Sequence, residues 1–174
     1  VQNNALTQVN VSDSAIWELD CSGNRLTELN VSGCGYLMNL MCGNNQLTAL
    51  ELADCRRLAT VDCSGNQLTA LNLSATNALL TLNCKNNRLS TLTFNSMSYP
   101  IHVDCSGNQL TELNTDTMQF TRYLDCSDNQ LTRLNVRNCS VVETFSCQGN
   151  KLERLDLTSD GKYHALSLNA LGEG

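Results

Sequence analysis

The stretch that decides the fold reads Leu19-Asp20-Cys21-Ser22-Gly23-Asn24-Arg25-Leu26-Thr27-Glu28-Leu29-Asn30-Val31-Ser32. Versions of it return every 21 residues along the 174-residue chain. The apolar residue that precedes the cysteine by two recurs at Leu19, Leu40, Val61, Leu82, Val103, Leu124, Phe145 and Leu166. A fixed period of this length predicts a solenoid, in which each repeat is one turn stacked on its neighbours.

Two parts of each repeat alternate between apolar and other residues. Leu40, Met41 and Cys42 alternate as a half-buried strand requires, and Leu50 and Leu52 repeat the alternation ten residues later. We therefore predict a first short strand and, on the opposite side of the turn, a second strand or extended segment. The expected fold is a β-rich, right-handed solenoid arc with a parallel sheet on its concave side and extended or short-turn segments on its convex side.

The repeat runs from one end of the chain to the other, which predicts a single domain over 1–174. We divide it into a partial turn at 1–15, seven 21-residue turns over about 16–162, and a partial terminal turn at 163–174. Because Val1 lies inside a repeat, we expect that a leader or cap once preceded it. The leucine columns that begin at Leu26 and Leu29 do not vary along the chain, and we expect both to lie in the core.

Two polar columns mark the corner that follows the first strand. The first contains glycine, or asparagine or aspartate in its place, which favours a positive φ angle. The second is an asparagine ladder, whose amides offer both a donor and an acceptor to backbone groups that the corner would otherwise leave unpaired. Its members are Asn24, Asn45, Asn66, Asn87, Asn108, Asn129 and Asn150.

The ten cysteines fall into two columns, Cys21, Cys42, Cys63, Cys84, Cys105, Cys126 and Cys147 in one and Cys34, Cys55 and Cys139 in the other. Neighbours in a column stand on parallel strands about 4.8 Å apart and point the same way. A disulfide instead needs Cβ atoms about 3.8 Å apart and a dihedral near 90°. We predict buried free thiols. The alternatives are limited pairing, with Cys34–Cys55 as the first candidate, and a metal site, which a linear column suits poorly because zinc needs four converging ligands.

With these motifs in view, the chain resembles bacterial leucine-rich-repeat surface proteins with 21-residue cysteine-ladder repeats, of the internalin type. The resemblance covers roughly residues 4–171 and rests on the stretch from Leu19 to Ser32. It implies an exported module at the cell surface or outside the cell that binds a protein or a glycan. It does not imply which ligand, because the shared residues are those of the scaffold.

Ligand selection then depends on the outward positions of the concave strands. Most of them hold small polar residues, but one histidine and one tyrosine fall in adjacent turns with carboxylates beside them. An exposed aromatic ring flanked by acceptors suits a sugar or a peptide anchor. The candidate ligand-binding residues are Thr81, His102, Asp104, Tyr123 and Asp125. The alternative is that the aspartates are solvated scaffold.

The repeat pattern weakens at 95–101 and 115–121, where Pro100, Thr115 and Thr121 replace apolar residues. We interpret this as sequence drift, with Met97, Met118 and Phe120 refilling the core. A bulged loop that makes contacts is the alternative.

Composition narrows the function further. The net charge of −6 argues against nucleic acid as a partner, and no apolar run approaches the length of a membrane span. We predict no catalytic residues, metal or cofactor, because the sequence offers only His102 and His164 as bases and the cysteines face inward. The expected function is a non-enzymatic recognition module, more consistent with a monomer than an oligomer. The alternative is a spacer or stalk of a larger surface protein with no ligand of its own.

Overall fold

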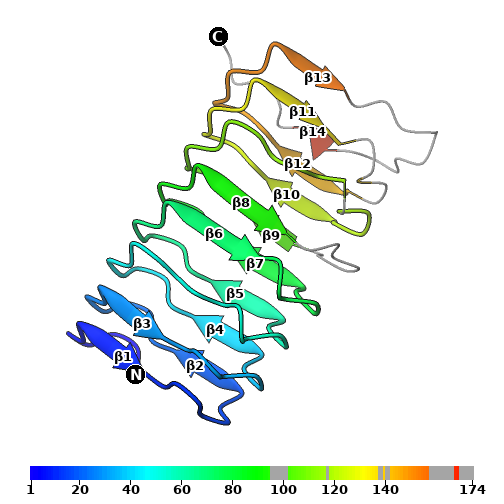
Figure 1. Ribbon diagram of the computed structural model, residues 1–174. Coiled ribbons are helices and arrows are strands. Elements are labelled where there is room, and N and C mark those ends of the chain that lie inside the picture. The colour runs from blue at the N-terminus through cyan, green and yellow to red at the C-terminus, as the bar shows by residue number, and fades with distance from the viewer. Residues whose placement is uncertain (95–101, 117, 137–138, 140–141, 157–166, 169–174) are drawn as a thin grey trace.

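The computed structural model describes residues 1–94, 102–116, 118–136, 139, 142–156 and 167–168. These residues form β-strands joined by turns, and no helix is found among them. The solenoid runs from the N-terminal turn at one end of Figure 1 to β13 near the other. The strands are β1 Gln8–Asn10, β2 Glu18–Asp20, β3 Glu28–Asn30, β4 Asn39–Met41, β5 Thr60–Asp62, β6 Ala70–Leu73, β7 Thr81–Asn83, β8 Thr91–Phe94, β9 His102–Asp104, β10 Tyr123–Asp125, β11 Arg133–Asn135, β12 Thr144–Ser146, β13 Arg154–Asp156 and β14 Ser167–Leu168.

One side of the solenoid is an eight-stranded parallel sheet in the order β2-β4-β5-β7-β9-β10-β12-β14 (Figure 1). From β2 to β12 its register follows the repeat, since Leu40 pairs with Val61 and Val103 with Leu124. The predicted parallel sheet and β-rich solenoid are therefore confirmed. The strands of this sheet are only two to three residues long, which leaves most of each turn for the corners and the opposite side.

The register changes at the last pair of this sheet. The sequence pattern places Leu166 21 residues after Phe145, but β14 pairs Leu168 with Phe145, so this part of the prediction is wrong. Strand residues alternate with a period of two, and a shift of two residues therefore leaves the pattern unchanged. The sequence alone does not distinguish the two registers. Leu166 itself lies outside the described residues.

The opposite side carries three two-stranded parallel sheets, β1-β3, β6-β8 and β11-β13. The predicted second strand is thus present in six turns, whereas 49–52 and 112–115 lie outside the strands. The column that begins at Leu29 is buried at Leu50, Leu71 and Leu134 but only partly buried at Leu92, Leu113 and Leu155. In the column that begins at Leu26, Leu152 is also only partly buried. Our expectation that both columns lie wholly in the core is wrong for these four members. Leu92 and Leu113 border the interruption between β8 and β11, and Leu152 and Leu155 lie at or just before β13, which pairs only with β11.

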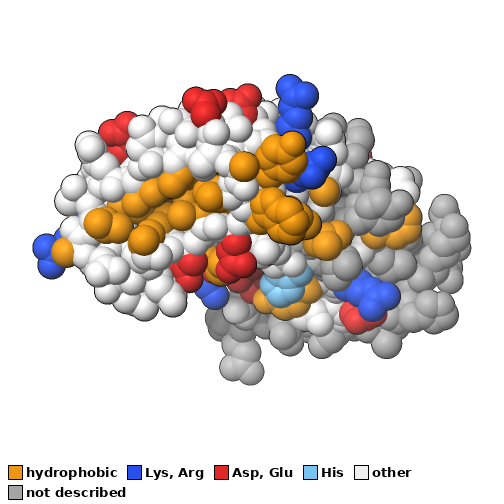
Figure 2. All heavy atoms as spheres, turned by 90° about the horizontal axis from the view of Figure 1, so that it is seen from below, with side chains coloured by type: hydrophobic (Ala, Val, Ile, Leu, Met, Phe, Trp, Pro, Cys, Tyr) orange, Lys and Arg blue, Asp and Glu red, His pale blue; other side chains and the backbone are white. Residues whose placement is uncertain are grey.

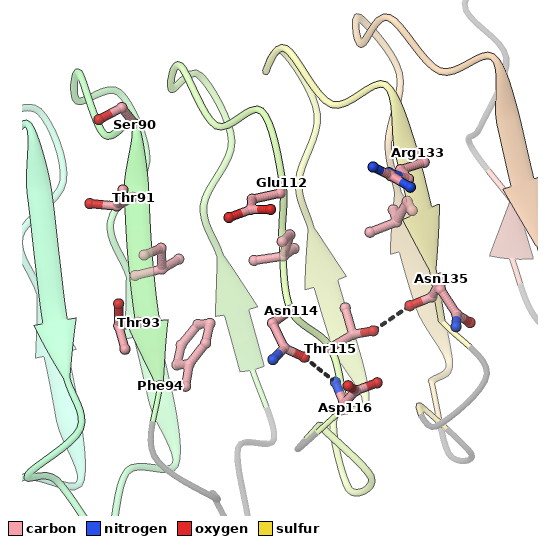
Figure 3. A pocket seen from close by; sticks show the side chains of 13 residues that line it. Ser90, Thr91, Thr93, Phe94, Glu112, Asn114, Thr115, Asp116, Arg133 and Asn135 are labelled. Carbon is pink, nitrogen blue, oxygen red and sulfur yellow. Dashed lines mark hydrogen bonds between the residues drawn. The ribbon is translucent and has the colours of Figure 1, made fainter.

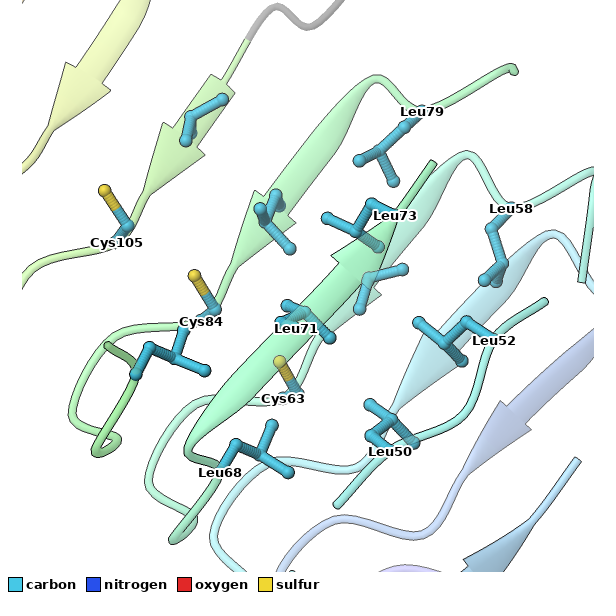
Figure 4. Packing of buried hydrophobic residues seen from close by; sticks show 14 of the residues in the cluster. Leu50, Leu52, Leu58, Cys63, Leu68, Leu71, Leu73, Leu79, Cys84 and Cys105 are labelled. Carbon is cyan, nitrogen blue, oxygen red and sulfur yellow. The ribbon is translucent and has the colours of Figure 1, made fainter. Parts of the chain in front are cut away.

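The core is a continuous column of leucines and thiols between the two sides. Figure 4 shows Leu68, Leu71 and Leu73 in one turn, and Cys63, Cys84 and Cys105 on successive turns. Burial of a leucine side chain contributes about 1.5–3 kcal/mol. Stability therefore accumulates turn by turn, through contacts between neighbours, as expected of a repeat array.

All ten cysteines are buried free thiols, as the geometry of parallel strands predicts. Burial raises the pKa of Cys21 to about 11 and that of Cys63 to about 12, chiefly because the thiolate would lose its hydration. Each thiol thus acts as a small apolar group in the core. All ten lie away from the outer surface of the solenoid.

The asparagine column binds backbone groups at each corner. Asn87 is typical: its Nδ2 donates to the carbonyls of Cys63, Cys84 and Lys85 at 3.0, 3.1 and 3.3 Å. Its Oδ1 accepts the N–H of Leu68 at 3.0 Å, one turn earlier. One side chain therefore serves both its own turn and the preceding one, which explains why an amide is needed at this position.

The column before these asparagines alternates between glycine and a longer residue. The φ angle of Gly107 is +63°. Asn86, one turn earlier, has a φ angle of +55°, and Asn44, its equivalent two turns before, has +54°. A Cβ added to Gly107 would lie 2.5 Å from Oδ1 of Asn86. The asparagine side chain of one turn thus occupies the space above the glycine of the next. This contact explains why the period of the column is two turns, although each turn has the same backbone.

Candidate functional site

The outer face of the eight-stranded sheet brings His102 and Tyr123 together. His102 is the first residue of β9 and Tyr123 the first of β10, and the two are register partners. Their rings are stacked, with centroids 4.1 Å apart and planes inclined by 4°. Both side chains are half-buried. The sequence placed these residues in adjacent turns, and the structure shows that they form one aromatic unit.

Asp104 and Asp125 also lie side by side on β9 and β10, but much of their hydrogen-bonding capacity is used within the scaffold. Oδ1 of Asp125 accepts the backbone N–H and the hydroxyl of Ser127 at 2.9 and 2.6 Å. Asp104 holds Ser106 in the same way, at 3.1 and 2.6 Å. One oxygen of each carboxylate therefore fixes the corner after its strand. This role favours the scaffold interpretation of the aspartates over a role as free ligands.

The second carboxylate oxygen of each aspartate faces another polar side chain of the same surface. Oδ2 of Asp104 lies 3.8 Å from Nζ of Lys85, and the Tyr123 hydroxyl donates to Oδ2 of Asp125 at 3.4 Å. Partial burial and then the charge of Asp125 raise the pKa of Tyr123. The phenol is thus neutral at physiological pH and is a hydrogen-bond donor. Thr81, the fifth candidate residue, is the register partner of His102 on β7.

The described residues contain no group of three or more histidine, cysteine, aspartate or glutamate side chains arranged to hold a metal ion. Asp104 is also only 8% exposed. The site geometry therefore supports contacts by an aromatic pair and a phenol, and does not assemble a cation site.

A row of exposed apolar residues, which sequence reasoning missed, borders the same sheet. Trp17, Met38, Ala59 and Leu80 each immediately precede a strand, in four successive turns. Trp17 is 69% exposed, Met38 43% and Leu80 41%. The 21-residue spacing of these four residues can be seen in the sequence. The sequence alone does not show whether such an apolar column is exposed or lies in the core. We call these four residues the apolar row.

A cleft of about 620 Å³ opens on the other side of the solenoid, where the two-stranded sheets are interrupted. Figure 3 shows Thr91 and Phe94 of β8 on one side of it, Arg133 and Asn135 of β11 on the other, and Glu112 and Asn114 between them. Thr115 stands where other turns have valine, leucine or phenylalanine, and its hydroxyl donates to the carbonyl of Asn135. This hydrogen bond ties the turn to β11 rather than to β8.

The irregular segment at 115–121 is partly as expected. Met118 is fully buried and refills the core, whereas Phe120 is 48% exposed and does not. The drift interpretation is therefore correct for the methionine and wrong for the phenylalanine, because the corner turns that ring away from the core. The segment 95–101, with Met97 and Pro100, lies outside the described residues.

No family model and no curated protein matches the chain. A solved structure similar to it is the functional domain of InlJ from Listeria monocytogenes, which includes a cysteine ladder. The two are 28% identical with a TM-score of 0.61, over 88% of this chain and 39% of that one. This chain has the leucine-rich-repeat fold with a cysteine ladder.

Two further structures share the fold. YopM, a leucine-rich effector protein of Yersinia pestis, is 24% identical with a TM-score of 0.69, over 86% of this leucine-rich-repeat chain and 44% of YopM. A leucine-rich-repeat protein of Leptospira interrogans is 17% identical with a TM-score of 0.59, over 88% and 49%. The chain thus spans less than half the length of each of the three proteins. Within its described residues, no helix is long and apolar enough to cross a membrane.

Proposed function

We propose that the chain is a non-catalytic recognition module of an exported bacterial surface protein, and that it binds a protein or a glycan through the concave, outer face of the eight-stranded sheet. The observation that carries this proposal is the stacked pair of His102 and Tyr123 at the middle of that sheet. Together with Thr81, Asp104 and Asp125 it forms what we call the central patch. Leucine-rich-repeat proteins generally act by binding, and the ladder repeat supports the assignment to bacterial surface proteins.

The central patch is suited to contact because its parts are already held in place. The imidazole covers one face of the Tyr123 ring, so the other face is turned toward β12, where the register partner is the small residue Thr144. The phenol hydroxyl is oriented by Asp125. A rigid ring with few rotatable bonds loses little conformational entropy on binding, which is why tyrosine is frequent at the centre of interfaces.

A binding role is more consistent with the face than catalysis is. A nucleophile needs a base within hydrogen-bonding distance and a third group that orients the base. The ten thiols are buried in the core, where burial raises the pKa of Cys63 and Cys105, and the described imidazole is packed against a ring. The proposal therefore assigns the outer face to recognition alone.

The test is a screen of the purified chain on glycan and protein arrays, followed by affinity measurements on the double variant Tyr123→Ala with His102→Ala. We expect the double variant to bind at least about tenfold more weakly, or about 1.4 kcal/mol, with an unchanged melting temperature. Glu28→Ala, on β3 of the opposite side, is the control and should bind normally. Retention of full affinity by the double variant would refute the central patch, and a chain that binds nothing on either array would favour the spacer alternative.

A further inference from the structure

The cleft on the side opposite the eight-stranded sheet opens along one edge of β8. On its other edge β8 pairs with β6, and this pairing begins where the N–H of Ser90 donates to the carbonyl of Thr69 at 3.0 Å. The same first hydrogen bond joins β13 to β11, from Glu153 to Thr132 at 3.0 Å. The equivalent bond from the N–H of Thr111 to the carbonyl of Ser90 is not found between these two described residues. The main chain of β8 is therefore open on the side that faces the cleft.

The separation of the two turns is confined to this side of the solenoid. At the preceding corner the N–H of Gln109 still donates to the carbonyl of Leu89 at 2.9 Å, and on the other side β9 pairs with β7. The hydroxyl of Thr115 donates to the carbonyl of Asn135 in the following turn. The turns are thus joined at the corner and at the eight-stranded sheet, while the segment that would close the cleft is held toward β11.

The cleft reaches the leucine core. Leu92 and Leu113 line it and are only partly buried. Their equivalents Leu71 and Leu134, in the neighbouring turns, are 2% and 4% exposed. Leu50 is 6% exposed although its segment, like that of Leu113, is not a strand. Loss of the strand alone therefore does not uncover the leucine, whereas separation of the turns does.

The side chains along β8 alternate. Thr91 and Thr93 are exposed, whereas Leu92 and Phe94 are partly buried. An open strand edge presents a row of N–H and C=O groups, and the structure that pairs with such a row is another extended chain. Because side chains on a strand alternate, every second residue of that chain would lie over Leu92 and Phe94. Apolar residues at those positions would cover the exposed part of the core.

The open main chain distinguishes this cleft from other exposed apolar surface. Figure 2 shows hydrophobic side chains gathered in a band on the face in view. In the apolar row the main chain is already paired from turn to turn, since the N–H of Met38 donates to the carbonyl of Trp17 and that of Leu80 to the carbonyl of Ala59, both at 2.8 Å. Such a row does not specify what covers it. The cleft does, because it asks for main-chain hydrogen bonds and apolar side chains together.

We infer that the open edge of β8 and the cleft bind an extended segment of another protein, which adds to β8 as a β-strand. Apolar residues at alternate positions of that segment lie against Leu92, Phe94 and Leu113, and the four residues of β8 set the length of the paired part. A saccharide would bind the hydroxyls of Thr91 and Thr93 but would place polar groups against the leucines. The site lies on the opposite side of the solenoid from the central patch and is independent of it.

The probe is a fluorescently labelled synthetic peptide that copies residues 67–74 of this chain. The segment contains β6, which already pairs with β8 on its other edge, and it has the required alternation of apolar residues. We expect saturable binding to the full chain with a Kd below about 1 mM by fluorescence anisotropy. The same peptide with Leu71→Ser and Leu73→Ser should bind at least about tenfold more weakly, because it cannot cover the leucines.

Main-chain pairing is tested with two further peptides, each N-methylated on every second amide, in opposite sets. A strand on the edge of β8 uses the amides of at least one set, so at least one of these peptides should bind about tenfold more weakly or worse. Binding of the unmodified peptide should also slow amide hydrogen exchange at 90–94 and leave the exchange of β2 and β4 unchanged.

Two variants of the chain test the walls of the cleft. Leu113→Ser removes an apolar wall and should weaken peptide binding at least about tenfold. Thr115→Val places at this position the valine found at Val136 and removes the hydrogen bond to Asn135, so that the segment can close on β8; binding should weaken about threefold or more. Phe120→Ser, which removes an exposed ring of the same turn outside the cleft, is the matched control and should change the affinity less than about twofold.

Four results would overturn the inference. They are the absence of saturable binding below about 1 mM, full affinity for both N-methylated peptides, and undiminished binding by both Leu113→Ser and Thr115→Val. The fourth is self-association of the parent chain in sedimentation velocity that Leu113→Ser abolishes, which would assign the edge to a second copy. Tyr123→Ala with His102→Ala should leave peptide binding intact, so that failure here and failure of the central patch are distinguishable.

Discussion

Replacement of Asn87 by alanine tests the role of the asparagine column at its most informative point. The side chain is 8% exposed and makes four hydrogen bonds with the backbone. Three of its four partners keep another donor. The carbonyls of Cys63 and Cys84 also accept from Asn66 and Asn108 at 3.0 and 3.1 Å, and that of Lys85 accepts the N–H of Gly65 at 3.0 Å.

The group left without its partner is the N–H of Leu68, which Oδ1 of Asn87 accepts at 3.0 Å. An unpaired buried donor costs about 1–3 kcal/mol. Asn87→Ala also removes one donor from each of three carbonyls and leaves a small void. We therefore expect a loss in the upper part of this range, about 2–3 kcal/mol in the free energy of unfolding. Urea unfolding followed by far-UV circular dichroism measures this as a shift of the midpoint at constant slope.

Asn30→Ala is the matched control. Oδ1 of Asn30 accepts the N–H and hydroxyl of Ser32 at 3.0 and 2.8 Å, but these groups are exposed and water replaces the lost acceptor. We expect a loss below about 0.5 kcal/mol. Equal losses for the two variants would refute the argument that burial of the orphaned N–H sets the magnitude.

Two further predictions concern the thiols and the glycine column. Burial holds Cys21 and Cys63 protonated in the folded chain up to pH of about 11 and 12, whereas the unfolded thiols ionise near 9. Above pH 9 the folded state therefore binds more protons than the unfolded state. The free energy of unfolding should be constant below about pH 8 and fall above pH 9 by about 1.4 kcal/mol per pH unit for each such thiol. Denaturant titrations from pH 7 to 10.5 check this, and a stability that rises over that range would contradict it. Gly107→Ala should destabilise the folded chain by about 1–3 kcal/mol, because φ at Gly107 is +63° and the new Cβ would collide with the Asn86 side chain. Asn86→Gly removes that side chain and should change the melting temperature little. Equal effects of the two variants would count against the contact between turns.

The candidate site was predictable from sequence only in part. The repeat places His102 and Tyr123 in the same column of adjacent turns, so their proximity follows from the period. Their parallel stacking does not, nor does the use of Asp104 and Asp125 to hold the serines that follow them. These features depend on side-chain torsions, which a column of residue types does not specify.

What the sequence by itself determined is the set of residues that faces inward. The 21-residue period, the leucines, the thiols and the corner asparagines repeat because every turn solves the same packing and backbone hydrogen-bonding problem. The tertiary structure decided where that solution is interrupted and what remains exposed: the shift to Leu168, the opening beside Thr115, and the apolar row from Trp17 to Leu80. The physical reason is that inward positions are constrained by every turn alike, whereas the exposure of an outward side chain depends on the particular residues stacked on either side of it.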